Sequence, residues 1–137
     1  MRAALETTRA AGRLTLAELR ARWRHLVDDP LVAAIPYKLE LNERGSIEVS
    51  PAPPRHGFLQ AFVASELRRL LPDGSTFTEC PVETEISVRV PDVVWASADF
   101  LSRNPPLDDP FESGPELCVE VLSPSNTRAE IEAKVAA

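Results

Sequence analysis

Apolar residues recur at helical spacing in two segments of the chain. The first segment follows a capping box formed by Thr15 and Glu18, and its apolar stripe consists of Leu16, Leu19, Trp23 and Leu26. We expect this helix to end near residues 28–30, and we interpret it as a packing helix without chemistry. The second segment predicts a longer helix over residues 56–71, which ends at Pro72-Asp73-Gly74.

Polar and apolar residues alternate in the remaining segments, which predicts strands. Residues 37–41 and 46–49 alternate on either side of a turn that contains Gly45, and together they predict a hairpin. Residues 82–90 alternate strictly and predict one half-exposed strand. The segment after Pro91 is shorter and more apolar, so we expect it to lie deeper in the sheet.

The C-terminal part of the sequence continues this mixed pattern. Residues 97–114 contain several prolines and predict a long loop. Residues 117–122 predict an apolar strand near the centre of the sheet, and a capping box of Thr127 and Glu130 begins a last helix. The order of elements predicts a mixed α/β fold, with an N-terminal helical extension over residues 1–36 and a domain over residues 37–137.

Composition limits the classes of protein that this chain can belong to. Its 137 residues suit a single hydrophobic core, and its net charge of −6 opposes nonspecific adhesion to nucleic acid but is compatible with a local basic groove. The sequence has no apolar run long enough for a membrane span and no signal peptide, so we expect a cytoplasmic protein without membrane contact. Cys80 and Cys118 lack metal-site spacing, and we expect two buried free thiols.

Two acidic residues lie in segments that are otherwise built for burial. Asp92 begins one apolar strand, and Glu120 interrupts another, where an unpaired charge would lose its hydration without compensation. If the two strands are neighbours, both carboxylates reach one edge of the sheet and can hold a hard divalent cation such as Mg²⁺. Alternatively, Asp92 caps the turn after Pro91, and Glu120 pairs with Arg89 or Arg128.

Lys134 lies on the last helix, which starts close to the end of the strand that carries Glu120. It is therefore a candidate for the positive charge near the two acids. The alternative is a surface ion pair with Glu130, which lies four residues earlier on the same helix. A nucleophilic pair of Cys118 with His56 or His25 is disfavoured, because a cysteine inside an apolar strand is usually a packing residue.

From about Tyr37 to Ala137 the sequence resembles the Uma-type restriction endonucleases of the PD-(D/E)XK nuclease superfamily, a family formerly known as a domain of unknown function. The motifs that carry the resemblance are the hairpin sequence from Leu39 with Gly45 and Ser50-Pro51, Arg55-His56-Gly57, Pro91-Asp92-Val93, the segment from Pro115 to Ser125, and Lys134. The long segment from Pro115 to Ser125 is the specific one. The resemblance implies a restriction-endonuclease-like core and a bacterial protein.

The resemblance also implies roles for individual residues. Asp92 resembles the metal-binding aspartate of the family, and Glu120 resembles the acidic member of the (D/E)XK motif. The superfamily pattern has lysine where this chain has Leu122, and Lys134 on the following helix occupies the place to which the family's lysine has moved. Glu40 resembles an early acidic residue of the family.

The implied activity is metal-assisted hydrolysis of the phosphodiester bonds of DNA. Asp92 and Glu120, with Glu40 and the carbonyl of Val121, would hold Mg²⁺ or Mn²⁺, and Lys134 would orient or help to deprotonate the attacking water. His56 resembles the family's histidine at the start of a helix and would contact phosphate or assist proton transfer. Candidates for contacts to the DNA backbone are Arg55, Arg68, Arg69 and Arg128, of which Arg68 and Arg69 fit better as a solvated helix face.

The sequence ends three residues after Lys134, whereas the family continues into further strands. We therefore expect a fold that lacks its last strands, from a truncated chain or a gene remnant, with an exposed strand edge that favours a homodimer. Two functions follow from different classes of protein. The first is a metal-dependent nuclease, and the alternative is a noncatalytic remnant that acts as a binding or interaction module.

Overall fold

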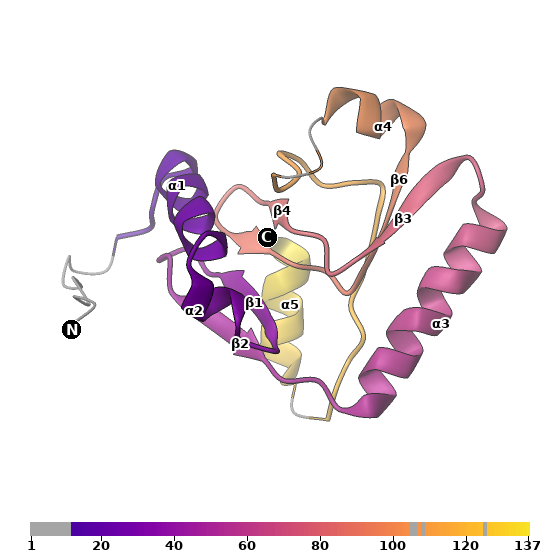
Figure 1. The fold of residues 1–137 in the computed structure, drawn as a ribbon, viewed down its shortest axis with the longest axis horizontal. Helices are drawn as coiled ribbons and strands as arrows, with labels where there is room; N and C mark the ends of the chain where they lie inside the picture. The colour runs from indigo at the N-terminus through magenta and orange to yellow at the C-terminus, as the bar shows by residue number, and fades with distance from the viewer. Residues whose placement is uncertain (1–11, 105–106, 108, 125) are drawn as a thin grey trace.

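The computed structural model describes residues 12–104, 107, 109–124 and 126–137 (Figure 1). The expectation for residues 1–11 therefore lies outside the described residues. The helices are α1 (Leu16–Val27), α2 (Pro30–Ala33), α3 (Pro54–Leu70), α4 (Ala98–Arg103) and α5 (Arg128–Ala136). The strands are β1 (Lys38–Leu41), β2 (Ile47–Ser50), β3 (Gly74–Thr78), β4 (Val82–Glu83), β5 (Val88–Arg89), β6 (Val93–Ser97) and β7 (Leu117–Val119).

The described strands form two sheets, and the mixed α/β class is confirmed. One sheet has the order β2-β1-β5-β4 and the other has the order β3-β6-β7, with antiparallel pairing between all these neighbours. Helix α1 covers the first sheet, and α3 lies beside β3 and β6 on the opposite side of the molecule (Figure 1). The chain passes directly from β5 to β6, so residues 90–92 connect the two sheets.

Helix α1 forms with both halves of its predicted capping box. The Thr15 hydroxyl accepts a hydrogen bond from the backbone N–H of Glu18, and the Glu18 carboxylate accepts one from the backbone N–H of Thr15. Leu19 and Trp23 are buried against β1 and β5 in the first of two core clusters. The packing role predicted for this helix is confirmed.

A long-range ion pair also holds α1 on the first sheet. The guanidinium of Arg20 donates two hydrogen bonds of 2.7 Å to the buried carboxylate of Glu83 in β4. Two parallel N–H···O bonds fix both the distance and the orientation of the partners. The pair therefore links the middle of α1 to β4 at a fixed distance.

The predicted hairpin of β1 and β2 is confirmed, with Glu40 opposite Glu48. Its turn contains Gly45, whose φ of 71° lies in the left-handed region that favours glycine. Leu14 and Arg22, from the segment that includes α1, lie directly over this glycine, and a Cβ atom there would overlap the side chain of Leu14. The turn therefore needs glycine both for its backbone conformation and for the close approach of α1.

The prediction of a single strand over residues 82–90 is wrong. The chain turns back within this segment, so that β4 and β5 pair with Glu83 opposite Val88. The Oγ1 of Thr84 accepts a hydrogen bond of 2.9 Å from the backbone N–H of Ser87 and stabilises the turn. A threonine that bonds the backbone a few residues further on is a local device for reversing the chain, and the alternation of polarity does not reveal it.

Further predictions about the second sheet and the residues near it are wrong. β6 is its buried central strand, as expected, but β7 lies at the edge of the described sheet rather than at its centre. Cys118 in β7 is exposed rather than buried, whereas Cys80 is half-buried. β3 was not predicted at all, and helix α4 lies within the predicted loop, where Ser97 caps its first turn.

Helices α3 and α5 are close to their predictions. α3 begins at Pro54, two residues earlier than expected, because a proline at the first helical position lacks only an N–H that would be unpaired there. α5 has both halves of the capping box of Thr127 and Glu130. No helix in the described part of the chain combines the length and the apolar character needed to cross a bilayer.

We predict that Trp23→Ala lowers the free energy of unfolding by about 3–5 kcal/mol, because it removes a buried aromatic side chain and leaves a cavity beneath α1. Urea denaturation measures this change. Leu31→Ala is the control, since Leu31 in α2 is 81% exposed, and its effect should stay within about 0.5 kcal/mol. Equal effects of the two substitutions would contradict the packing of α1 as part of the core.

Candidate active site

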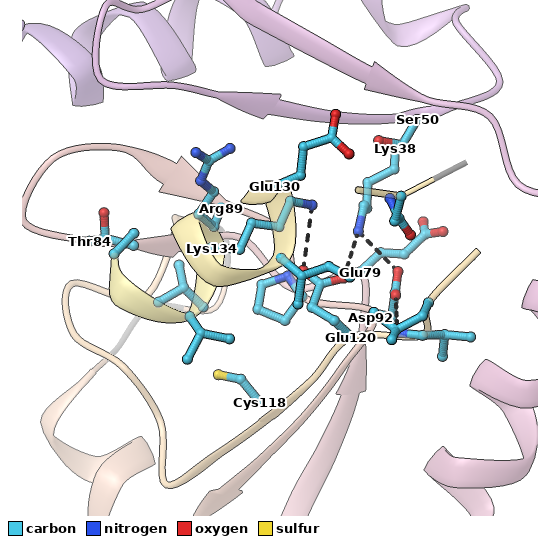
Figure 2. A pocket seen from close by; sticks show the side chains of 18 of the residues that line it. Lys38, Ser50, Glu79, Thr84, Arg89, Asp92, Cys118, Glu120, Glu130 and Lys134 are labelled. Carbon is cyan, nitrogen blue, oxygen red and sulfur yellow. Dashed lines mark hydrogen bonds and ion pairs between the residues drawn. The ribbon is translucent and has the colours of Figure 1, made fainter. Parts of the chain in front are cut away.

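The pairing of β6 with β7 places the two predicted acids side by side. Val93 lies opposite Val119, and Asp92 and Glu120 are the next residues at the same end of this strand pair. The condition set for a shared site, that the two strands are neighbours, is therefore met. Both side chains line the same cavity, and both lie close to the side chain of Lys38 from β1 (Figure 2).

A lysine lies between the two carboxylates. Lys38 Nζ is 3.0 Å from Asp92 Oδ1 and 3.3 Å from Glu120 Oε2, and both contacts are ion pairs (Figure 2). The Lys38 side chain is only 10% exposed, so these interactions are weakly screened by water. The positive charge that the two buried acids require is thus supplied by a residue of β1.

Further hydrogen bonds fix the carboxylate of Asp92, which is 1% exposed. Its Oδ2 accepts a hydrogen bond of 2.7 Å from the backbone N–H of Val121 and lies 3.1 Å from Nε2 of His56. Burial alone would raise the pKa of Asp92, but the Val121 N–H and the ammonium of Lys38 outweigh burial and lower this pKa. Asp92 is therefore held as a carboxylate.

Glu40 forms the second part of the site. It shares one face of β1 with Lys38, because side chains two residues apart in a strand point the same way. Glu40 is 1% exposed, its Oε1 accepts a hydrogen bond of 2.9 Å from the backbone N–H of Val90, and its Oε2 is 2.9 Å from Lys134 Nζ. Arg89 adds a longer contact of 3.7 Å to the same carboxylate.

Lys134 connects Glu40 with Glu120. Its Nζ is also 3.7 Å from Glu120 Oε1, so the side chain reaches from α5 into the acidic cluster (Figure 2). The alternative pairing with Glu130 does not form, because the carboxylate of Glu130 accepts a hydrogen bond from the backbone N–H of Thr127 at the helix start. The lysine on the last helix therefore faces the predicted site.

The arginine pairings considered for Glu120 are also absent from the described ion pairs. Arg89 Nη1 is instead 2.6 Å from Glu48, where it bridges the opposing carboxylates of Glu48 and Glu40. Arg128 pairs with Glu132 on the surface of α5. Glu120 thus depends on the two lysines for its neutralising charge.

The environment of Glu120 disfavours its ionised form. The pKa of Glu120 rises from 4.5 to about 7, because burial and the nearby Asp92, which raise it, outweigh Lys38 and Lys134, which lower it. Burial would lower the pKa of Lys38, but Glu120, Asp92 and Glu40 together outweigh burial and raise it. The cluster is thus an acid pair with one carboxylate firmly ionised and the other close to its titration point near neutral pH.

A cavity of about 970 Å³ lies next to these residues and α5. Its polar lining includes Lys38, His56, Asp92, Glu120 and Lys134, and its apolar lining includes Leu122, Ile131 and Val135. The volume exceeds what a single ion requires and lies at the upper end of the range for small-molecule sites. The cavity can therefore admit part of a substrate next to the acid pair.

The donor chemistry of the site suits a hard divalent cation. Among the described residues, no three His, Cys, Asp or Glu side chains form a ready metal site. However, Asp92 and Glu120 already share one stand-in cation, the Lys38 ammonium, and Mg²⁺ usually binds to only one or two carboxylates and retains several waters. Two oxygen ligands from this pair therefore fit such an ion. At Val121 the contact with the acid pair is made by the N–H group.

The structure brings together all five side chains that the sequence singles out, namely Glu40, His56, Asp92, Glu120 and Lys134. Sequence reasoning missed Lys38, which makes two contacts within the cluster. A signal for it exists, because Lys38 precedes Glu40 by two residues in a predicted strand and therefore shares its face. The candidate DNA contact Arg69 pairs with Glu66 on the exposed face of α3, as the solvated interpretation predicts.

Comparison with known proteins identifies the family. The family described as "Uma2: Putative restriction endonuclease" matches residues 30–137, and the chain therefore belongs to this family. A solved structure described as a "putative nuclease belonging to DUF820" from Anabaena variabilis has a similar fold, with a TM-score of 0.57 and 18% sequence identity. The match covers 72% of this chain and 57% of that protein, so this chain spans little more than half of its length. No curated protein matches the sequence.

We predict that Glu120→Gln becomes more stable relative to the wild type as the pH rises from 5 to 8. The folded state holds the Glu120 proton up to about pH 7, whereas the unfolded chain releases it near 4.5. The wild type therefore loses stability through this group over that interval, and glutamine does not. The expected relative gain is on the order of 1 kcal/mol, measured by urea denaturation at several pH values.

Glu132→Gln provides the control, because Glu132 is an exposed residue of α5 that pairs only at the surface. Its stability difference from the wild type should stay nearly constant over the same pH range. A Glu120→Gln variant that becomes less stable relative to the wild type with rising pH would show that the lysine pairs outweigh burial.

Proposed function

We propose that the protein is a metal-dependent nuclease that hydrolyses phosphodiester bonds of DNA with Mg²⁺ or Mn²⁺. The observation that supports this proposal most strongly is the acid pair of Asp92 and Glu120, which shares one cation at the wall of a large cavity. Membership of the Uma2 family supports a nuclease in general terms. The metal, the DNA substrate and the residue roles below are parts of the proposal.

The acidic residues would hold the metal. Asp92 and Glu120 offer oxygen ligands from adjacent strands, and Glu40 lies within reach of the same lysine as Glu120. When bound, the ion would polarise the phosphodiester and stabilise its developing negative charge. The carbonyl of Val121 stays a candidate ligand from the sequence, and the N–H of the same residue would keep the carboxylate of Asp92 in position.

The basic residues would act on the water and on the phosphate. Lys134 Nζ lies between Glu40 and Glu120 at the cavity wall, where it would orient the attacking water or help to remove its proton. His56 donates a hydrogen bond through Nε2 to the carboxylate of Asp92, and the side chain also lines the cavity. It would contact a phosphate oxygen or assist proton transfer.

A noncatalytic binding module is the second candidate, and the ion pairs themselves favour it. Lys38 and Lys134 already contact the three acids, so the cluster can be a structural element that needs no metal. In that case the cavity and the family fold would serve binding alone. The two candidates differ in whether the chain cleaves DNA when a divalent metal is supplied.

We predict that the wild type nicks or linearises circular plasmid DNA in the presence of Mg²⁺ or Mn²⁺. Asp92→Asn and Glu120→Gln should each lower the rate at least about 100-fold, because each removes a charged ligand that stabilises the transition state. Agarose gel electrophoresis measures the rate. Asp99→Asn is the matched control, since Asp99 lies on α4 with its side chain 81% exposed and pairs only with Arg103. Absence of cleavage at every metal concentration would favour the binding module.

We further predict that Lys134→Met lowers the cleavage rate by about 100-fold while DNA binding changes little, because a general acid or base contributes at least this factor. Lys134→Arg then separates the two possible roles. Arginine keeps the positive charge but does not exchange a proton at neutral pH, so retained activity would indicate orientation and lost activity would indicate proton transfer. Full activity of Lys134→Met would contradict any role of this lysine.

A further inference from the structure

Lys38 has no role in the reaction proposed above. Its ammonium nevertheless lies 3.0 Å from Asp92 Oδ1. The side chain comes from β1 in the first sheet, whereas its acidic partners flank two strands of the second sheet: Asp92 directly precedes β6, and Glu120 directly follows β7. Lys38 is therefore distant in the sequence from both acids, by 54 and 82 residues. It spans the gap between the sheets and ends between two carboxylates (Figure 2).

We propose that Lys38 is a built-in counterion of the acid pair, which a divalent cation displaces when it binds to Asp92 and Glu120. This inference rests on the proposed function, because it specifies how the metal site of that function becomes available. Lys38 is then a positioning residue. It holds two buried carboxylates close together in the metal-free protein and competes with the metal for them.

The geometry supports competition rather than joint binding. Lys38 Nζ contacts Asp92 through Oδ1, and the other oxygen of that carboxylate is occupied by the backbone N–H of Val121 and by His56. The oxygen available to a metal on Asp92 is therefore the one that the ammonium holds. A divalent ion and an ammonium repel each other, so they do not share this position.

Lys134 provides an internal comparison within the same cluster. Its ammonium is 2.9 Å from Glu40 and 3.7 Å from Glu120, and no contact with Asp92 is described. Removal of Lys134 should therefore affect metal binding by Asp92 and Glu120 much less than removal of Lys38. The two lysines differ in position but not in charge, which makes them a matched pair for testing the inference.

The test is a titration of MnCl₂ into the full chain, in which isothermal titration calorimetry measures the affinity for Mn²⁺. We expect Lys38→Met to bind Mn²⁺ at least about tenfold more tightly than the wild type and Lys134→Met to gain clearly less than Lys38→Met, while the surface control Arg103→Met changes the affinity less than about threefold. Lys38→Met combined with Asp92→Asn should lose the gain. An unchanged or weaker affinity of Lys38→Met, or no Mn²⁺ binding by it, would overturn the proposal.

A second measurement on the wild type covers the case in which Lys38→Met does not fold. The chain contains two lysines, Lys38 and Lys134, so acylation of each by acetic anhydride can be followed separately by mass spectrometry. Saturating Mn²⁺ should accelerate acylation of Lys38 at least about tenfold and that of Lys134 less than about threefold. Bound Mn²⁺ without any change at Lys38 would overturn the proposal.

The outcomes also separate this inference from the proposed nuclease function. Tighter Mn²⁺ binding by Lys38→Met in a protein that never cleaves DNA would support the counterion role and contradict the nuclease. Metal-dependent cleavage by the wild type, together with equal Mn²⁺ affinity of the wild type and Lys38→Met, would support the nuclease and contradict the counterion role.

Discussion

Two carboxylates that are withdrawn from water need a shared positive charge, and the arrangement of the site depends on this constraint. Buried ions are costly unless they are paired and hydrogen-bonded. Here the ammonium of Lys38 contacts Asp92 and Glu120 together, and Lys38 lies in the first sheet whereas its partners flank strands of the second. The ion pairs consequently connect the two sheets across the cavity. The first sheet supplies Lys38, Glu40 and Arg89, and the residues next to β6 and β7 of the second sheet supply the acid pair. Neither part forms the cluster alone.

How much of the site could be predicted depends on how far apart in the sequence its interacting residues lie. A shared site for Asp92 and Glu120 could be inferred, because each is an acid in an otherwise apolar strand and needs a compensating positive charge. The identity of the cation was not, since Lys38 is separated from Asp92 by 54 residues and from Glu120 by 82. Tertiary pairing over such separations leaves no periodic signal. The only local indication was the shared face of Lys38 and Glu40 on β1.

The fold shows the same division between local and distant determinants. Capping boxes and the hairpin of β1 and β2 were predictable because they depend on neighbouring residues. The turn between β4 and β5 was missed because the hydrogen bond of Thr84 overrides a polarity pattern that suits one continuous strand. β3 was missed because its sequence, Gly74 to Thr78, has no strong alternation and forms a strand through its pairing with β6. Helix α1 lies outside residues 30–137, which match the family, yet it completes the first core cluster.

Gly45 shows how little variation one position tolerates. Its backbone lies in the left-handed region, and a Cβ atom at this position would lie 2.4 Å from Leu14 Cδ1 and 3.0 Å from Arg22 Cδ. Every amino-acid replacement adds a Cβ atom, so any missense change at this codon would both strain the turn and push the covering segment away. The position of α1 on the sheet, and with it the ion pair of Arg20 with Glu83, therefore depends on the absence of a side chain at one residue of the turn between β1 and β2.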